Sequence, residues 1–312
     1  TNSNYLMLQS KKISVDDYLK YEKMDNINYV IPGDSNINMY IDTRTYYQTE
    51  NVGLTISGSL ASIKMIKEAD LLYGRMPNNE NEIIIDKMVY KNTQNIKMIG
   101  LYDISKMLDT NVYLGNHLLE YKIVGIVDME SPSIYTNESE FIKIIDNSAT
   151  EDSAGSGDVY DYELYKDKIN IKKGHAPNND YEVIVNQDLE YQFKLDKYID
   201  EVKINGNKLK VVGYYTSADD INSYFVNTNT NKYELIEKSK NMIIYANDKE
   251  KIINDFKELD KKVIDVYKAD KETYVKEHKE SITSSLIVAA IMLGISLIEI
   301  ILMTDRKSTR LN

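Results

Sequence analysis

Residues 74–86 read GRMPNNENEIIID, and residues 174–186 read GHAPNNDYEVIVN, one hundred positions further along the chain. In both stretches a glycine and a Pro-Asn-Asn triplet precede a short run rich in β-branched residues. Glycine supplies the positive φ angles of tight turns and proline fixes φ near −65°, so each stretch predicts a turn that leads into a strand. The structural turn residues of the two copies are Gly74, Pro77, Gly174 and Pro177.

A second pair of similar segments follows in the same order. Residues 122–127 read KIVGIV and residues 210–215 read KVVGYY, each a predicted strand with an internal glycine. Coincidence between ordinary turn-strand units is the alternative, but two ordered matches favour an internal repeat, 74–127 and 174–215. We expect both turns to adopt one shape and each following strand to bury alternate residues on one face. These residues are Ile83 and Ile85 in the first copy and Val183 and Val185 in the second.

A small and polar stretch, residues 146–158, lies between the two copies and reads DNSATEDSAGSGD. This composition predicts a solvated loop or hinge. A calcium-binding loop is the alternative for its acidic residues, but the DxDxDG spacing with a glutamate at the twelfth position is absent.

The last polar part of the chain has a β-α-β pattern. An apolar strand is predicted at 242–246, and Asn247 is the expected N-cap of the next helix, with Glu250 completing a capping box. A strand at 263–267 and a highly charged helix over 270–281 follow. The helix between the two strands has one apolar face, formed by Ile252, Ile253, Phe256 and Leu259.

The segment Ile282–Met303 reads ITSSLIVAAIMLGISLIEIILM and carries one formal charge. A helix of this length spans roughly 33 Å, enough for the hydrocarbon core of a bilayer. A buried helix of a soluble protein is the alternative, but such helices are seldom apolar on every face. Ala290 and Gly294 form a small-xxx-small pair for close packing against another helix. Glu299 stands near the far end, where its carboxylate reaches the interface or pairs with a neighbouring helix.

The overall composition excludes some functions. The net charge of −11 repels phosphate backbones, so nucleic acid is not an expected partner. The chain has no cysteine, which excludes disulfides and thiolate metal sites. Residues 305–312 read DRKSTRLN, which looks like the translation of a sequencing adapter, and the chain begins at Thr1. We therefore expect a fragment of a longer protein. The richness in Asn, Lys, Ile and Tyr suggests an AT-rich genome, and a Gram-positive bacterium is the expected source.

The order of several segments resembles the FtsX/MacB-like permeases of ABC transporters. These segments are the strand at 29–32, the LTISGS stretch at 54–59, the motif at 74–86, the strand at 122–127 and the helix end SLIEIILM at 296–303. The resemblance implies an ectodomain that lies outside the cytoplasm, between the first and second transmembrane helices of a cell-membrane protein. The chain would then retain the second of these helices.

The predicted fold class is α+β, with an extracytoplasmic domain over 1–281 and a transmembrane helix over 282–304. Within the domain, 1–70 and 217–281 are expected to form a membrane-proximal subdomain with a β-α-β sheet. Residues 71–216 are expected to form an inserted, β-rich subdomain that contains the repeat. This division places the N-terminal strand beside the strands at 242–246 and 263–267, because both membrane helices must leave from one place.

The implied function is that of a permease subunit that couples cytoplasmic ATP hydrolysis to work outside the membrane, such as export or extraction of a peptide, lipid or lipoprotein, or activation of a partner. The implied partners are an ABC ATPase subunit or domain, a second permease copy and membrane lipid. The helix from Asp270 to Met303 would act as the lever. The alternative is a membrane-anchored sensor that binds an extracellular ligand without transport.

No residues for catalysis, cofactor binding or metal binding are predicted, and the chain is not expected to be an enzyme. The sequence has no GxxxxGK[ST] loop for ATP, no GxSxG and no HExxH. Its histidines, His117, His175 and His278, have no partner at metal-ligand spacing. The many acidic residues leave a glycosidase open, because sequence alone does not set the distance between two carboxylates.

Overall fold

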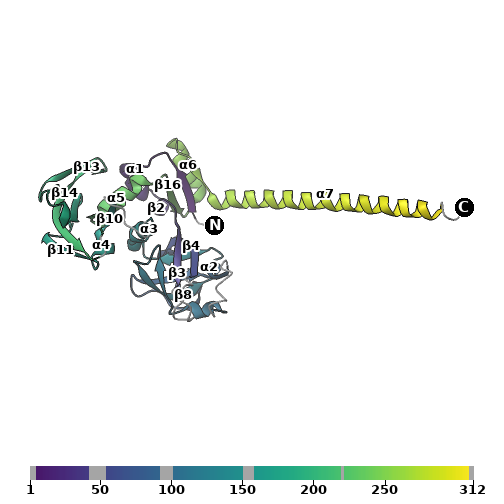
Figure 1. Ribbon diagram of the computed structural model, residues 1–312, viewed down its shortest axis with the longest axis horizontal. Coiled ribbons are helices and arrows are strands. Elements are labelled where there is room, and N and C mark those ends of the chain that lie inside the picture. Colours follow the sequence, from purple (N-terminus) through teal and green to yellow (C-terminus); the bar gives the residue numbers. More distant parts are fainter. Residues whose placement is uncertain (1–4, 42–53, 92–100, 150–157, 219–220, 309–312) are drawn as a thin grey trace. The chain divides into compact units, whose positions relative to one another are not determined.

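Three β-sheets and a long C-terminal helix make up this mixed α/β protein (Figure 1). The computed structural model describes residues 5–41, 54–91, 101–149, 158–218 and 221–308. The chain divides into two units, Thr1–Asp265 and Val266–Asn312, which we describe separately. All three sheets belong to the first unit.

Sheet A joins both ends of the first unit. Its strands and helices are β1 (Tyr5–Gln9), α1 (Val15–Glu22), β2 (Ile27–Pro32), β16 (Asn241–Ala246), α6 (Lys249–Glu258) and β17 (Val263–Ile264). The strand order is β17-β1-β16-β2, with every neighbouring pair antiparallel. Two split β-α-β units therefore interleave in the ferredoxin-like arrangement. The expected pairing of N-terminal and C-terminal strands is present, and the sequence analysis had missed β1 and α1.

Helices α1 and α6 cover one face of sheet A. Ser14 caps α1 by accepting the backbone N–H of Asp17, and Asp248 caps α6 by accepting that of Lys251. The predicted cap, Asn247, lies one residue before the observed cap. The N–H of Asn247 still donates to the carbonyl oxygen of Asn26 at the edge of the sheet, so the helix begins later. The apolar core beneath the helices contains Leu6, Leu8, Tyr18, Tyr21, Met242, Ile244, Ile252 and Phe256.

The opposite face of sheet A carries a row of tyrosines. Tyr5, Tyr245 and Tyr29 lie side by side on three neighbouring strands. The rings of Tyr245 and Tyr29 stack with their centroids 4.2 Å apart. Tyr245 donates a hydrogen bond to the carbonyl of Leu60 (3.1 Å), and the hydroxyl of Tyr29 accepts the N–H of Ser62 (3.0 Å). Leu60 and Ser62 both belong to β4 of sheet B. The tyrosine row therefore connects sheet A to sheet B through hydrogen bonds.

Sheet B consists of β3 (Asn36–Ile41), β4 (Leu54–Ser62), β5 (Leu71–Gly74), β6 (Glu82–Asp86), β7 (Asn111–Leu114), β8 (Glu120–Val127) and β9 (Ser133–Thr136). Its order is β5-β8-β6-β9-β4-β3-β7, and β7 also pairs with β8. This last pairing closes six strands into a ring, with β5 attached outside. The neighbouring helical segments are η2 (Ile63–Met65), η3 (Glu68–Asp70), α2 (Lys87–Lys91), η5 (Ile104–Met107), η6 (Glu138–Glu140) and α3 (Phe141–Ala149).

Sheet C consists of β10 (Val159–Asp161), β11 (Ile169–Gly174), β12 (Glu182–Asn186), β13 (Tyr198–Ile204), β14 (Asn207–Ser217) and β15 (Tyr224–Val226). Its order is β10-β15-β12-β14-β11, with β13 beside β14. The associated helical segments are α4 (Tyr162–Tyr165), η7 (Gln187–Leu189) and α5 (Thr228–Lys238). Helix α5 contacts both β10 and β13. These two strands correspond to β4 and β7 of sheet B, which lie on either side of β3.

Sheets B and C are two copies of one structural repeat. In each, a parallel pair (β6 with β8, β12 with β14) contains a register shift after its second residue pair. Gly74 pairs with Gly125 in one copy, and Gly174 pairs with Gly213 in the other. The repeat continues beyond the predicted limits, since β9 and α3 correspond to β15 and α5.

The burial of the repeated strands differs from the prediction. We expected alternate residues to be buried on one face, but Ile83, Ile84 and Ile85 all have 0 % exposure, and the equivalent residues of β12 are equally buried. Both strands are central in their sheets and are covered on both faces, which requires a continuous apolar run.

The boundaries of the sheets also differ from the boundaries of the predicted subdomains. Strands β3 and β4 share sheet B with β5 to β9, because β4 pairs in parallel with β9. The two copies of the repeat therefore occupy separate sheets, and the predicted insertion over 71–216 does not correspond to one of them.

The second unit contains helix α7 (Val266–Ser308). The predicted strand at 263–267 was too long, since β17 ends at Ile264 where its pairing with β1 ends. Among the residues whose side chains the structure describes, no helix has a stretch long and apolar enough to cross a membrane. The side chains of residues 288–291 and 293–308 lie outside the described part. These residues make up most of the predicted span and include its packing residues Ala290, Gly294 and Glu299.

Candidate functional site

The two repeat turns begin with the same glycine conformation but differ just before the strand, where Tyr181 has a positive φ of 63° and the equivalent Asn81 does not. Gly74 and Gly174 have φ angles of 83° and 82°. A Cβ on Gly74 would lie 2.2 Å from the carbonyl oxygen of Val124, and one on Gly174 would lie 2.0 Å from that of Val212. Only glycine permits this close approach between the turn and the neighbouring strand. Pro77 and Pro177 lie in the turns that follow.

A glutamate organises each turn. Glu82 accepts two hydrogen bonds from the guanidinium of Arg75 (2.7 and 2.6 Å) and one from the N–H of Asn78 (2.7 Å). Arg75 above all, and then the Asn78 amide, lower the pKa of Glu82 to about 2. In the second copy His175 stands in place of Arg75, and Glu182 accepts the backbone N–H groups of two asparagines (both 2.9 Å). These contacts are structural, because each glutamate holds the backbone of its turn.

Alanine at Gly174 is expected to destabilise the first unit by at least about 2 kcal/mol, because left-handed backbone strain adds to a steric clash with Val212. Gly206 is a matched control, since its φ is also positive (73°) and a Cβ added there would have no atom within 4 Å. Denaturant unfolding of both variants measures the difference. Equal losses in Gly174→Ala and Gly206→Ala would show that the close approach contributes nothing.

The histidines are used for packing. The ring of His117 lies against Tyr40 and Tyr113, and His278 stacks on Tyr274. Nδ1 of His175 lies 2.7 Å from the carbonyl oxygen of Ala176. Within the described parts of the chain, no group of three or more His, Asp or Glu side chains is placed to hold a metal ion.

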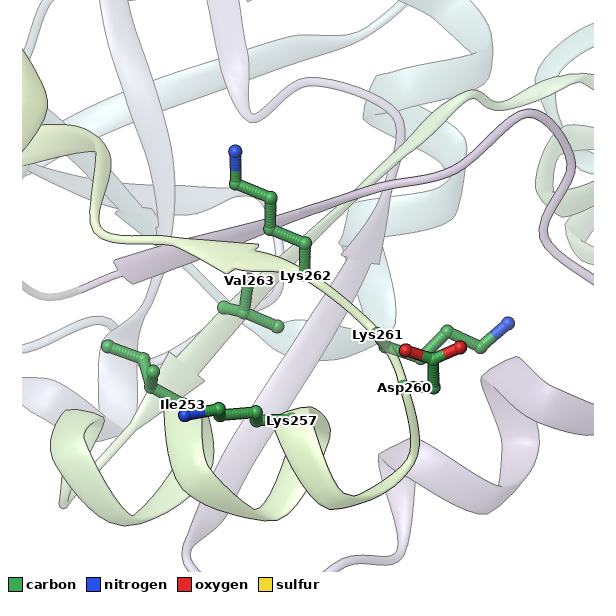
Figure 2. A pocket seen from close by; sticks show the side chains of 6 residues that line it. All are labelled: Ile253, Lys257, Asp260, Lys261, Lys262 and Val263. Carbon is green, nitrogen blue, oxygen red and sulfur yellow. The ribbon is translucent and has the colours of Figure 1, made fainter.

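A shallow pocket of about 310 Å³ lies between α6 and β17. Ile253 and Lys257 on α6 and Val263 on β17 form its walls, and the connecting loop supplies Asp260, Lys261 and Lys262 (Figure 2). Figure 2 shows that the side chains of Lys257 and Lys262 extend in different directions. The lysines therefore do not converge on a common point, as an anion-binding site would require.

The connection between sheet A and α7 is short and held in place. One residue, Asp265, separates the end of β17 from the first residue of α7. Its carboxylate lies 2.6 Å from the Nζ of Lys249, at the start of α6, and the two side chains are only 16 % and 29 % exposed. An aspartate in this position before a helix also favours the helix start. The last residue of the first unit is thus tied to sheet A.

The most unusual polar group of the structure is a buried cluster where α3, β10 and α5 meet. Asp146 on α3 is 2 % exposed, and Asp161 on β10 is fully buried. The N–H of Asp161 donates to Oδ2 of Asp146 (3.1 Å), while Oδ1 of Asp161 accepts the N–H of Glu163 and so caps α4. Helix α5 adds Asn231, which is fully buried, and Glu234, which pairs with Lys238. We name these four residues, Asp146, Asp161, Asn231 and Glu234, the junction cluster.

Burial favours the neutral form of all three acids in the junction cluster. It raises the pKa of Asp146 to about 7, with a further contribution from the charge of Asp161. Burial also raises the pKa values of Asp161 and Glu234. Perturbed pKa values of this kind cluster at functional sites, although structural networks produce them too.

The sequence analysis had placed Asp146 in a solvated loop, which was wrong for this residue. Residues 146–149 form the end of α3, and 150–157 lie outside the described residues. The apolar spacing of Phe141, Ile144 and Ile145 is the signal that could have extended the helix through Asp146.

Comparison with known proteins gives no family assignment. No family model matches the chain, and no curated protein matches it. Among solved structures, the periplasmic region of MacB from Actinobacillus actinomycetemcomitans aligns with 14% identity over 46% of this chain and 69% of that chain, with a TM-score of 0.28. The extracellular domain of the noncanonic ABC-type transporter YknZ from Gram-positive bacteria aligns with 13% identity over 46% and 77%, with a TM-score of 0.27. Scores of this size do not show a shared fold.

Proposed function

We propose that this chain is the extracytoplasmic domain and second transmembrane helix of an FtsX/MacB-like ABC transporter permease. It transmits movement of the membrane helix to the three sheets and is not itself an enzyme. In this role residues 1–281 lie outside the cytoplasm and 282–304 cross the membrane. The sequence resemblance supports the family, and the structure supports the mechanical role through a single observation, the one-residue connection between sheet A and α7.

That connection matters because sheet A gathers both ends of the first unit. β1 lies between β17 and β16, so a force applied to β17 reaches the N-terminal strand directly through backbone hydrogen bonds. A permease needs such an arrangement, since its first and second membrane helices connect to the two ends of the ectodomain. The tyrosine row then carries the movement from sheet A to sheet B.

The proposed membrane partners are a second permease copy and an ABC ATPase subunit or domain. Ala290 and Gly294 would form the packing face of the span, and Glu299 would lie near its cytoplasmic interface. No cofactor is proposed for this chain. The transported or activated substrate would be a peptide, a lipid or a lipoprotein.

Topology mapping of the intact gene product tests this proposal. Because the chain has no cysteine, single cysteines introduced at exposed positions report their location by reaction with a membrane-impermeant maleimide. We expect Lys172→Cys to react in whole cells and a cysteine at position 305 to react only after permeabilisation. Four spans and co-purification of an ATPase support the transporter, whereas one span followed by a signalling domain contradicts it.

The Lys249–Asp265 ion pair is expected to be needed for coupling. Lys249→Ala leaves the half-buried carboxylate of Asp265 without this partner, at a cost of about 1–2 kcal/mol. If the pair stiffens the connection, the variant should lower transport-coupled ATP hydrolysis several-fold while the ATPase keeps its basal rate. Lys87→Ala is the control, because Lys87 is about as exposed as Lys249 and its 3.0 Å pair with Asp128 lies at the ends of β6 and β8, away from the connection. Equal effects of the two variants would argue against a special role for the connection.

A further inference from the structure

The junction cluster lies where parts of all three sheets come together. Helix α5 contacts α3, which follows sheet B, and β10, which belongs to sheet C. It also contacts α1 of sheet A, where Lys232 pairs with Glu22 (2.8 Å). A change in the packing of α5 therefore alters how the repeats contact each other.

The cluster contains hydrogen-bonding atoms that its neighbours do not satisfy. Within the described residues, Oδ2 of Asp161 and both polar atoms of the Asn231 side chain have no hydrogen-bond partner, although both residues are fully buried. The Asn231 side chain nevertheless lies close enough to Asp146 to lower its pKa as a hydrogen-bond donor, and the Thr228 side chain does the same for the Asp161 carboxylate. Unsatisfied groups of this kind cost free energy, and two of the three atoms are acceptors that need a donor.

The charged and titratable groups around Asp146 supply few such donors. On the elements packed against it these groups are Glu140 and Lys143 on η6 and α3, Asp158 just before β10, Tyr160 and Asp161 on β10, Tyr162, Glu163 and Tyr165 on α4, and Lys232, Tyr233, Glu234, Glu237 and Lys238 on α5. Lys143 pairs with Glu140, and Lys238 pairs with Glu234. The proton that a neutral Asp146 carries, and an ionised Asp146 lacks, adds one donor to this cluster.

We propose that Asp146 is a proton switch at the contact between the two repeats. In its neutral form it keeps the Asp161 N–H as donor and donates its own O–H to Oδ2 of Asp161 or Oδ1 of Asn231. This closes α3 against β10 and α5. In its ionised form it loses that hydrogen bond and faces the carboxylate of Asp161, so the contact loosens.

The neutral range of pH is where this switch operates. Burial raises the pKa of Asp146 to about 7 in the closed state, whereas a carboxyl group released to water ionises near pH 4. Loss of the proton therefore favours the open state, and binding of a proton favours the closed one. The inference concerns the contact between sheets B and C and does not depend on the transport function.

Distance measurement between two spin labels tests the switch in the full 312-residue chain in detergent. The chain has no native cysteine, so labels attach only at Glu120→Cys on β8 and Lys172→Cys on β11, both outward-facing positions. Between pH 5.5 and pH 8.5 we expect the single narrow distance distribution at low pH to broaden or to gain a second maximum. The midpoint should lie near pH 7. A distribution that is the same at all pH values overturns the proposal.

Three variants assign the effect to Asp146. Asp146→Asn reproduces the neutral form, with an amide that both accepts and donates, and should keep the low-pH distribution up to pH 8.5. Asp161→Asn removes the facing charge and should move the midpoint down by roughly one pH unit. Glu140→Gln, a buried acid of the same helical segment that bonds Tyr121 and Lys143, should leave the midpoint unchanged. A wild-type midpoint in Asp146→Asn overturns the proposal even if the parent chain responds to pH.

Discussion

Tyr245→Ala is expected to destabilise the first unit by about 3–5 kcal/mol, the range for truncating a large buried aromatic side chain. Tyr245 has 0 % exposure and contacts the rings of both Tyr5 and Tyr29. Its removal leaves a cavity between sheets A and B and breaks the hydrogen bond to the carbonyl of Leu60. Because this bond and the ring contacts connect different sheets, the variant should also loosen sheet B from sheet A.

Two further variants separate the parts of this effect. Tyr245→Phe keeps the ring and loses only the hydroxyl, so it should cost about 1–2 kcal/mol, the value for a buried hydrogen bond whose acceptor is left unpaired. Tyr191→Ala is the control for a tyrosine that is 76 % exposed, and it should change stability by less than about 0.5 kcal/mol. Denaturant unfolding measures all three. A loss in Tyr245→Ala no larger than that in Tyr191→Ala would refute the role of the tyrosine row.

Asp146→Asn is expected to stabilise the folded chain at pH 8 by up to about 4 kcal/mol. The pKa of Asp146 rises from 3.8 to about 7 on folding, and each unit corresponds to about 1.4 kcal/mol. The folded state thus holds a proton between pH 4 and pH 7 that the unfolded state has released. Stability contributed by this residue falls as the pH rises through that window, and above pH 7 the whole penalty is present.

The variant removes this penalty because asparagine has no charge to bury. At pH 4 and below, the folded state keeps Asp146 protonated and the unfolded state has released only about half a proton or less, so the stabilities of the two proteins should agree within about 1 kcal/mol. Chemical denaturation at pH 4, 6 and 8 measures the difference. A variant that is less stable than the parent chain at pH 8, or equally stable at every pH, contradicts the raised pKa.

The sequence predicted those parts of the fold that local chemistry determines. The positive φ of Gly74 and Gly174 followed from the turn motif, because few other residues tolerate that conformation. The strand at 242–246 followed from its apolar run. The pairing of the N-terminal and C-terminal strands came from a topological argument, and the structure confirms it.

The parts that were missed depend on long-range contacts. β4 joins sheet B through β9, more than seventy residues away, and nothing in its own residues indicates that partner. The short strand β17 was predicted three residues too long, since helix α7 already begins at Val266. The junction cluster brings Asp146 and Asn231 together from separate copies of the repeat, so no sequence spacing could have revealed it.

A measurement of whether sheet A moves in response to ATP in the proposed transporter tests the central claim most directly. Spin labels at Lys251→Cys, an exposed position of α6, report the distance between two permease copies purified with their ATPase. We predict that trapping with ATP and vanadate changes this distance, and that Val275→Pro, which breaks the helical link to the membrane, abolishes the change while ATP hydrolysis continues. A distance that does not respond to ATP in the parent protein, or that responds equally in Val275→Pro, would contradict a mechanical role for this chain.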